Sequence, residues 1–423
     1  MVVSRLGWRD YLQLFTNRRI AVTLLLGFSS GLPLALTGST LQAWFTVSGV
    51  NIVTIGFLGL VGQPYIYKFL WAPLMDRYVP PLLGRRRGWL LLTQAGLLVT
   101  IIAMGTLSPA VTPWHLGLLA LAVAFLSASQ DIVIDAYRTD LLRPAERGLG
   151  AAAVVGGYRV AMLVSGGVAL IMSEWLGWRA TYTLMGVLMA VGILATLIGP
   201  EPERQVVPPR TLADAVWKPF WEFITRPGAA GLLLMIVLYK FGDAFAGTLT
   251  TAFLIRGAGF SPADVGAIYK SLGLFATLLG IFLGGTLMAE LGLFRSLLWF
   301  GILQGVSNLS FVALAAAGKS YPLMVFAVTL ENFTAGMGTA AFVAMLMALC
   351  DARYTATQYA LLSALSAVGR VFLGPPAGYL VESLGWGKFF FVTFIAALPG
   401  LGLLWLLRRR VEDLNGTTAA RQE

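Results

Sequence analysis

The stretch GYRVAMLVSGG…EWLGW, within residues 157–178, returns later in the chain as GRVFLGPPAG…ESLGW, within residues 369–386. Both copies are apolar, rich in glycine and end in LGW, and Arg159 and Arg370 occupy equivalent places. The loop PLMDRYVPPLLGRRRG likewise corresponds to TLMAELGLFRSL in the second half of the chain. Two matches in the same order predict that the chain is built from two copies of one unit.

The composition indicates that these copies are membrane domains. Of the 423 residues, 57% are hydrophobic and only 12% are charged, whereas a soluble domain carries about 25% charged residues. The 48 glycines are typical of closely packed membrane helices. One cysteine and one histidine exclude a disulfide framework and a Cys/His metal site. We expect no metal and no cofactor. The predicted class is an all-α polytopic membrane protein.

The apolar runs predict twelve transmembrane helices as two six-helix pseudo-symmetric bundles, because a bilayer core needs about 20 apolar residues per helix. The expected spans are 20–45, 53–75, 89–107, 115–137, 148–173, 179–199, 229–255, 263–289, 294–317, 321–349, 355–381 and 387–407. The predicted domains are an N-terminal bundle at 1–199 and a C-terminal bundle with a cytoplasmic tail at 229–423. Residues 200–228 are rich in proline and charge and predict a linker, with a short amphipathic segment around Trp217–Phe223.

The basic residues predict the orientation. Of the 30 Lys and Arg residues, most lie near the N-terminus, at 77–87, at 138–147, in the linker and beyond Arg408. The loops of the opposite side hold only four: Arg179, Arg256, Lys319 and Lys388. The positive-inside rule therefore places both termini and the linker in the cytoplasm. The net charge of +10 is explained by this topology and requires no nucleic-acid partner.

The candidates for proton coupling are carboxylates within predicted spans, namely Asp131, Asp135, Asp243 and Glu331. Such groups face the bundle interior or a watery cavity, where a low dielectric disfavours the ionised form. Asp131 and Asp135 share one helical face, and Ser127 extends the same polar stripe. An alternative for Asp135, near the cytoplasmic end, is an ion pair with Arg138 or Arg147.

Basic and polar residues within the spans are candidates for substrate binding, since buried bases offer charge-assisted hydrogen bonds to anionic groups. They are Gln63, Tyr67, Lys68, Arg159, Lys240, Lys270, Gln304, Asn308 and Arg370. Two alternatives stay open at this point. Lys240 and Asp243 are three residues apart on a helix and could neutralise each other, and Arg159 and Arg370 could brace the two halves.

The loop at 72–87 resembles the signature between the second and third helices of the major facilitator superfamily, with three extra residues between its two parts. That superfamily consists of parallel six-helix repeats that hold substrate between the halves near the midplane. The resemblance implies a cytoplasmic gate at Asp76, Arg77, Arg85, Arg86 and Arg87. The same arginines are equally compatible with a role in setting the orientation.

Long blocks throughout the chain resemble AmpG-type muropeptide permeases. Examples are GFSSGLPLALTGSTLQAWF (27–45), GQPYIYKFLWAPLMDRY (62–78), SASQDIVIDAYRTDLL (127–142) and YKFGDAFAGTLTTAFLIRGAGF (239–260). The resemblance implies a proton-driven importer of N-acetylglucosaminyl-1,6-anhydromuramyl peptides in the inner membrane of Gram-negative bacteria. It also implies a role in cell-wall recycling, in β-lactamase induction and hence in β-lactam resistance. We expect the protein to be a monomer. The acids of SQDIVIDA correspond to Asp131 and Asp135.

Alternative functions make different demands on the sequence. A major facilitator transporter of another large anionic solute, such as acetyl-CoA, stays possible because acetyl-CoA transporters are distant relatives. A membrane enzyme such as a glycosyltransferase would need a cluster of catalytic residues on a loop, and the short loops of this sequence supply none. We therefore expect a transporter and no enzyme.

Overall fold

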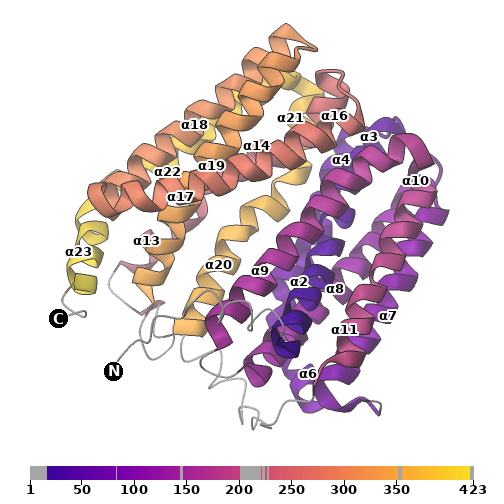
Figure 1. The fold of residues 1–423 in the computed structure, drawn as a ribbon. Coiled ribbons are helices and arrows are strands. Elements are labelled where there is room, and N and C mark those ends of the chain that lie inside the picture. The colour runs from indigo at the N-terminus through magenta and orange to yellow at the C-terminus, as the bar shows by residue number, and fades with distance from the viewer. Residues whose placement is uncertain are drawn as a thin grey trace. The chain divides into compact units, whose positions relative to one another are not determined.

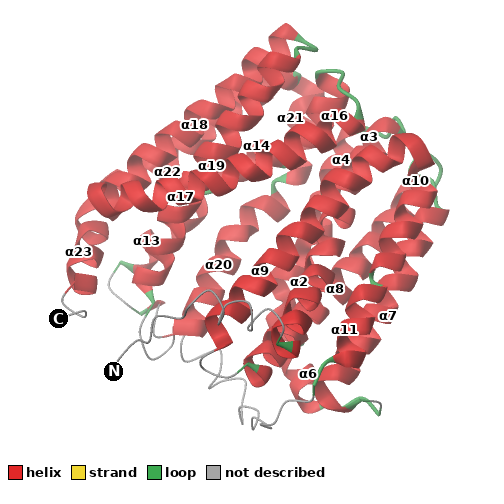
Figure 2. Ribbon diagram, viewed as in Figure 1, coloured by secondary structure: helices red, strands yellow, loops and turns green. Residues whose placement is uncertain are grey.

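The computed structural model describes residues 17–81, 83–142, 146–200, 228–350 and 355–419, together with residues 221, 224 and 225. Every regular element within these ranges is a helix (Figure 2). The predicted all-α class is therefore confirmed. Most of the predicted linker and its amphipathic segment at Trp217–Phe223 lie outside the described residues.

The described helices form two compact units. Unit 1 contains residues 17–44 and 61–200, and unit 2 contains residues 45–60 and 228–419. Residues 45–60 join unit 2 because α4 (Ile52–Phe57) packs against α21 (Gly374–Leu384), where Gly56 and Gly374 meet backbone to backbone. From chain order alone, this segment was expected in the N-terminal bundle. The predicted bundle boundaries at 1–199 and 229–423 stay a prediction.

Unit 1 is held together by close contacts between glycine-bearing helices. Its helices are α2 (Arg18–Thr37), α5 (Gln63–Tyr67), η2 (Lys68–Leu70), α6 (Ala72–Arg77), α7 (Gly84–Thr106), α8 (Pro113–Leu141), α9 (Arg147–Leu163), η4 (Val164–Val168), α10 (Ala169–Leu188) and α11 (Ala190–Ile198). In Figure 1, α2 lies beside α9. A methyl group at Gly157 of α9 would collide with the carbonyl oxygen of Leu24 on α2. Small residues at such crossings let membrane helices approach closely.

Unit 2 also contains close helix–helix contacts at glycines. Besides α4 and α21, its helices are α13 (Ala229–Tyr239), α14 (Phe241–Gly247), α15 (Thr250–Ala252), η6 (Phe253–Gly257), α16 (Pro262–Asp264), η7 (Val265–Leu272), α17 (Gly273–Leu291), α18 (Leu293–Ala317), α19 (Tyr321–Leu349), α20 (Thr355–Phe372), α22 (Trp386–Leu406) and α23 (Arg408–Ala419). Gly280 of α17 lies against the carbonyl oxygen of Phe333 on α19. The helices α3 (Ser39–Val47) and η1 (Leu58–Gly62) cross the boundaries between the units.

Ten helical runs among the described residues are long and apolar enough to cross a membrane. One of them, the 46-residue run Ala153–Ile198, covers two predicted spans, which Gly177 separates with φ 75° and ψ 164°. Gly385 separates α21 from α22 with φ 78° and ψ 170°. These are the glycines of EWLGW and ESLGW, so the two sequence copies make the same turn.

Two of the predicted spans are divided into shorter helices at prolines. The predicted span 53–75 is a series of short helices, α4, η1, α5, η2 and α6, in which Pro64 and Pro73 begin new turns. The predicted span 355–381 is divided between α20 and α21, and Pro375 and Pro376 stand at the start of α21. Proline has no N–H to continue the preceding helix, which explains these breaks.

Candidate functional site

Asp131 is half-buried on α8 and is held by a neighbouring helix. The Ser30 hydroxyl of α2 donates a hydrogen bond of 2.6 Å to Asp131 Oδ1. The charges of Lys68 and Asp135 also act on this carboxylate. Asp131 thus has polar surroundings within unit 1, as expected for an intramembrane acid that is not exposed to lipid.

The residues next to this pair form a buried polar seam between α2 and α8. Ser29 Oγ donates a hydrogen bond of 2.9 Å to Gln130 Oε1, and Gln130 Nε2 donates one of 3.1 Å to the carbonyl oxygen of Ser29. This reciprocal pair fixes the register of the two helices and hence the position of Asp131. We did not single out Ser29, Ser30 or Gln130 from the sequence, although two adjacent serines within an apolar span were an available signal.

Asp135, one turn along α8, has a different environment. Its Oδ1 lies 3.0 Å from Nη2 of Arg138, and the two side chains are 55% and 34% exposed. The ion pair with Arg138, which the sequence offered as the alternative for Asp135, is therefore formed. An exposed pair of this kind contributes little to stability.

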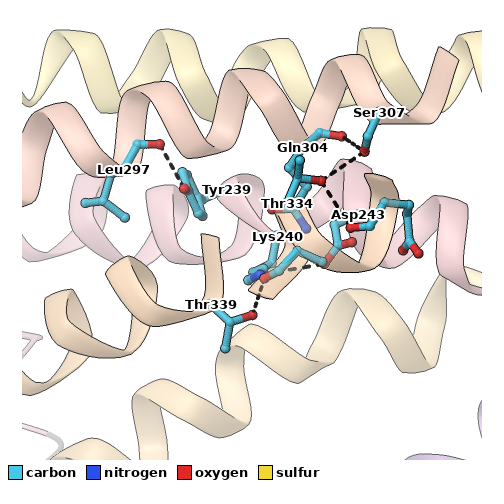
Figure 3. A network of polar contacts seen from close by, with 10 residues as sticks. Tyr239, Lys240, Asp243, Leu297, Gln304, Ser307, Thr334 and Thr339 are labelled. Atoms are coloured by element: carbon cyan, nitrogen blue, oxygen red, sulfur yellow. Dashed lines mark hydrogen bonds and ion pairs between the residues drawn. The ribbon is translucent and has the colours of Figure 1, made fainter. Parts of the chain in front are cut away.

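Unit 2 contains a charged network at the break between α13 and α14. Lys240 stands between the two helices, and its Nζ lies 3.6 Å from Oδ2 of Asp243 (Figure 3). Its ammonium also lies 5.6 Å from the centre of the Phe342 ring, on which Tyr239 stacks at 5.5 Å. The Tyr239 hydroxyl donates to the carbonyl oxygen of Leu297 on α18. The ion pair between Lys240 and Asp243, which the sequence offered as an alternative, is therefore formed.

Glu331 and Lys270 extend this network. Glu331 of α19 accepts a hydrogen bond of 2.7 Å from Asn332 Nδ2, and the charges of Asp243, Lys270 and Lys240 act on it. Lys270 lies on η7, a π-helical segment, with its Nζ 4.2 Å from the centre of the Tyr269 ring. Two acids and two bases therefore share one neighbourhood, and their formal charges cancel.

Gln304 and Asn308 lie one turn apart on α18 and are 5% and 2% exposed. The side-chain nitrogens Gln304 Nε2 and Asn308 Nδ2 find no hydrogen-bond partner within the described part of the chain. Figure 3 shows Gln304 in the same polar network as Lys240 and Asp243. A buried amide donor without a partner costs free energy, so a group that accepts from it, such as a substrate carbonyl, would be favoured here.

Replacing Asn308 with Leu is expected to weaken substrate binding about tenfold, the value of roughly one hydrogen bond. Thermal stability should be unchanged or higher, because the substitution removes an unpaired buried amide. Ser296→Ala is the matched control, since Ser296 also carries an unpartnered buried oxygen on α18. Binding measured by calorimetry checks both; equal effects of the two variants on affinity would contradict the assignment of Asn308.

The remaining substrate-binding candidates belong neither to the polar surroundings of Asp131 nor to the charged network of unit 2. Gln63 and Arg159 are half-buried, and Tyr67 and Arg370 are exposed. None of these four side chains makes a hydrogen bond or ion pair among the described residues. They stay predictions from the sequence.

The candidate gate residues make contacts inside unit 1. Arg86 Nε lies 3.0 Å from Oδ2 of Asp140 on α8. Arg87 donates to the carbonyl oxygens of Thr196 and Leu197 at the end of α11. Arg77 is exposed and Arg85 half-buried, and the side chain of Asp76 lies outside the described residues. Two of the arginines therefore tie α7 to α8 and α11.

Replacing Arg86 with Ala is expected to destabilise the protein by about 3 kcal/mol, because it leaves the carboxylate of Asp140 buried without its partner. The side chains of Arg86 and Asp140 are 11% and 6% exposed, so solvent screens the pair little. Arg77→Ala is the control, since Arg77 is exposed. Thermal unfolding in detergent measures the difference, and equal melting temperatures of the two variants would refute it.

Comparisons with known proteins agree with this architecture. The sequence profile of the Major Facilitator Superfamily matches residues 28–319. The anhydromuropeptide permease of Escherichia coli (strain K12) is 55% identical over 404 residues, which are 95% of this chain and 82% of that protein. The putative transporter AmpG 4 of Rickettsia felis (strain ATCC VR-1525 / URRWXCal2) is 35% identical over 409 residues, covering 94% and 99% of the two chains.

A solved structure of a POT family transporter in complex with 5-aminolevulinic acid is similar in fold. The TM-score is 0.73, and the match covers 97% of this chain and 99% of the other. The sequence identity is only 11%, so the likeness concerns the fold alone.

Proposed function

Because the chain belongs to the major facilitator superfamily, and within it to the AmpG-type permeases, we propose that it imports anhydromuropeptides. It is a multi-pass membrane transporter and not an enzyme. The observation that carries the proposed substrate is the 55% identity, over 95% of the chain, to an anhydromuropeptide permease. The substrates are N-acetylglucosaminyl-1,6-anhydromuramyl peptides, and the protein acts as a monomer in the inner membrane with both termini in the cytoplasm.

The proposed driving force is the proton gradient, used by alternating access. Asp131 is the first candidate for the proton site, because it is half-buried, bound to Ser30 and within reach of the charge of Lys68. Asp243 and Glu331 are further candidates, since they share one neighbourhood with two bases. Asp135 ranks behind them because its ion pair with Arg138 is exposed.

The charged network of unit 2 supports a role in substrate binding. Lys240 and Lys270 offer charge-assisted bonds to carboxylates of the stem peptide, and Gln304 and Asn308 supply unpaired amide donors for carbonyl groups. The aromatic pair Tyr239 and Phe342 gives the network a flat apolar border. By returning wall fragments to the cytoplasm, the transporter would serve cell-wall recycling and β-lactamase induction.

Uptake into proteoliposomes tests the proposal. Vesicles containing the purified protein are given labelled anhydromuropeptide with an inward proton gradient, without a gradient, and with a protonophore. We expect accumulation only with the intact gradient. A parallel assay uses labelled acetyl-CoA: uptake of acetyl-CoA without uptake of anhydromuropeptide would replace the proposed substrate, and uptake that ignores the gradient would refute the coupling.

A further inference from the structure

The short helix α5 and the 3₁₀ turn η2 each bring one side chain to the neighbourhood of Asp131. The helix α5 has five residues, Gln63–Tyr67, and lies between the 3₁₀ turns η1 and η2. Both α5 and η2 pack on α8, the helix of Asp131. Tyr65 belongs to α5, and Lys68 is the first residue of η2.

Lys68 supplies a positive charge that acts on the Asp131 carboxylate. The other charged group that acts on Asp131 is Asp135, which is itself paired with Arg138. An ionised carboxylate within a membrane span needs a nearby cation or water. Lys68, which also lies in unit 1, supplies this cation. From the sequence alone, Lys68 was predicted to bind the substrate.

The second side chain near Asp131 is Tyr65, whose hydroxyl can donate and accept a hydrogen bond. Tyr65 Oη is buried and finds no hydrogen-bond partner among the described residues, and the same is true of Ser127 Oγ, one turn before Asp131 on α8. The charge of Asp131 acts on Tyr65, and the Ser127 and Thr37 hydroxyls and Tyr158 are its other polar neighbours. Buried polar side chains are mostly hydrogen-bonded in native proteins, so an unpaired pair of hydroxyls beside Asp131 calls for a partner.

We propose that α5 and η2 give Asp131 two alternative partners, with Lys68 as the counter-ion of the ionised carboxylate and Tyr65 as the hydrogen-bond partner of the protonated acid. Proton uptake by Asp131 removes the charge that Lys68 balances, and the carboxyl group then bonds to the phenol. Lys68 and Tyr65 are thus positioning residues of the proton site and not substrate ligands. The inference rests on the proposed coupling role of Asp131.

The decisive experiment compares Lys68→Gln with the double variant Lys68→Gln/Asp131→Asn in proteoliposome counterflow of anhydromuropeptide, which needs no gradient. Lys68→Gln leaves the carboxylate without its counter-ion and should slow counterflow about tenfold, a coupling of ordinary size for two interacting residues. Adding Asp131→Asn removes the unbalanced charge and should restore most of that loss. Lys388→Gln, which changes an exposed lysine, is the control.

The outcomes separate the two proposals. If the double variant is as slow as Lys68→Gln, Lys68 binds substrate and the counter-ion assignment is wrong. If Asp131→Asn alone accumulates substrate as well as the unmodified protein, the proposed coupling role itself is wrong.

Tyr65→Phe provides a second readout, because it removes only the hydroxyl. Gradient-driven accumulation should fall several-fold more than counterflow does, since only the coupled cycle requires the protonated acid to be held. Equal losses in the two assays would show a merely structural role for Tyr65 and overturn its part of the proposal.

Discussion

Replacing Asp131 with Asn is expected to abolish gradient-driven accumulation of anhydromuropeptide. A gradient of one pH unit is worth about 1.4 kcal/mol and supports about tenfold accumulation for each proton carried. Asparagine has nearly the same shape as aspartate and can still accept the hydrogen bond from Ser30, but it cannot carry a proton. The ratio of internal to external substrate in proteoliposomes should therefore fall to about one, the value of passive equilibration.

The control for this variant is Glu412→Gln, which neutralises an exposed carboxylate on α23. It should accumulate substrate like the unmodified protein. Counterflow by the Asp131 variant should stay measurable, because exchange across the membrane needs no net proton movement. Accumulation by Asp131→Asn at the level of the control would remove Asp131 from the coupling role and direct attention to Asp243 and Glu331.

Replacing Gly157 with Leu is expected to prevent assembly of unit 1. Even the first carbon of the new side chain would collide with the backbone of Leu24 and Phe28 on α2, and backbone atoms cannot move aside as a flexible side chain can. Forcing α2 and α9 apart should cost about 3 kcal/mol or more, a large part of the stability of an ordinary domain. Yield of monodisperse protein on size-exclusion chromatography and the melting temperature measure the effect.

The neighbouring Gly156 gives a matched control. A side-chain carbon at Gly156 would meet nothing within 4 Å, and the residue is exposed. Gly156→Leu changes the hydrophobicity and the helix propensity of the same helix by the same amount but adds no collision. A melting temperature of Gly157→Leu equal to that of Gly156→Leu would show that the α2–α9 contact does not limit stability.

The sequence predicted the helical class because each span has to satisfy its backbone hydrogen bonds within the bilayer, which leaves a continuous apolar run as a signature. The predicted spans also leave Gly177 and Gly385 between helices, and both residues lie in turns of the structure. It did not predict the broken span at 53–75. Hydropathy averages over a window, and a run such as GLVGQPYIYKF stays apolar whether the backbone is one helix or several.

For the candidate site, sequence reasoning worked where the partners are neighbours in the chain. Lys240 with Asp243 and Asp135 with Arg138 are each three residues apart, and both pairs are formed. Sequence reasoning did not identify partners that lie on different helices. Ser30 and Asp131 are separated by 101 positions, and only the packing of α2 against α8 brings them together.

The matching turns at Gly177 and Gly385 also restrict the substitutions that the two copies of the repeat can accept. Both have φ near +75°, a conformation that costs other residues about 1 kcal/mol or more. A side chain at either position would strain the turn that reverses the chain between two helices. The likeness of the two copies at this point therefore follows from the requirements of folding, whereas positions at which the copies differ are open to a separate task in each half.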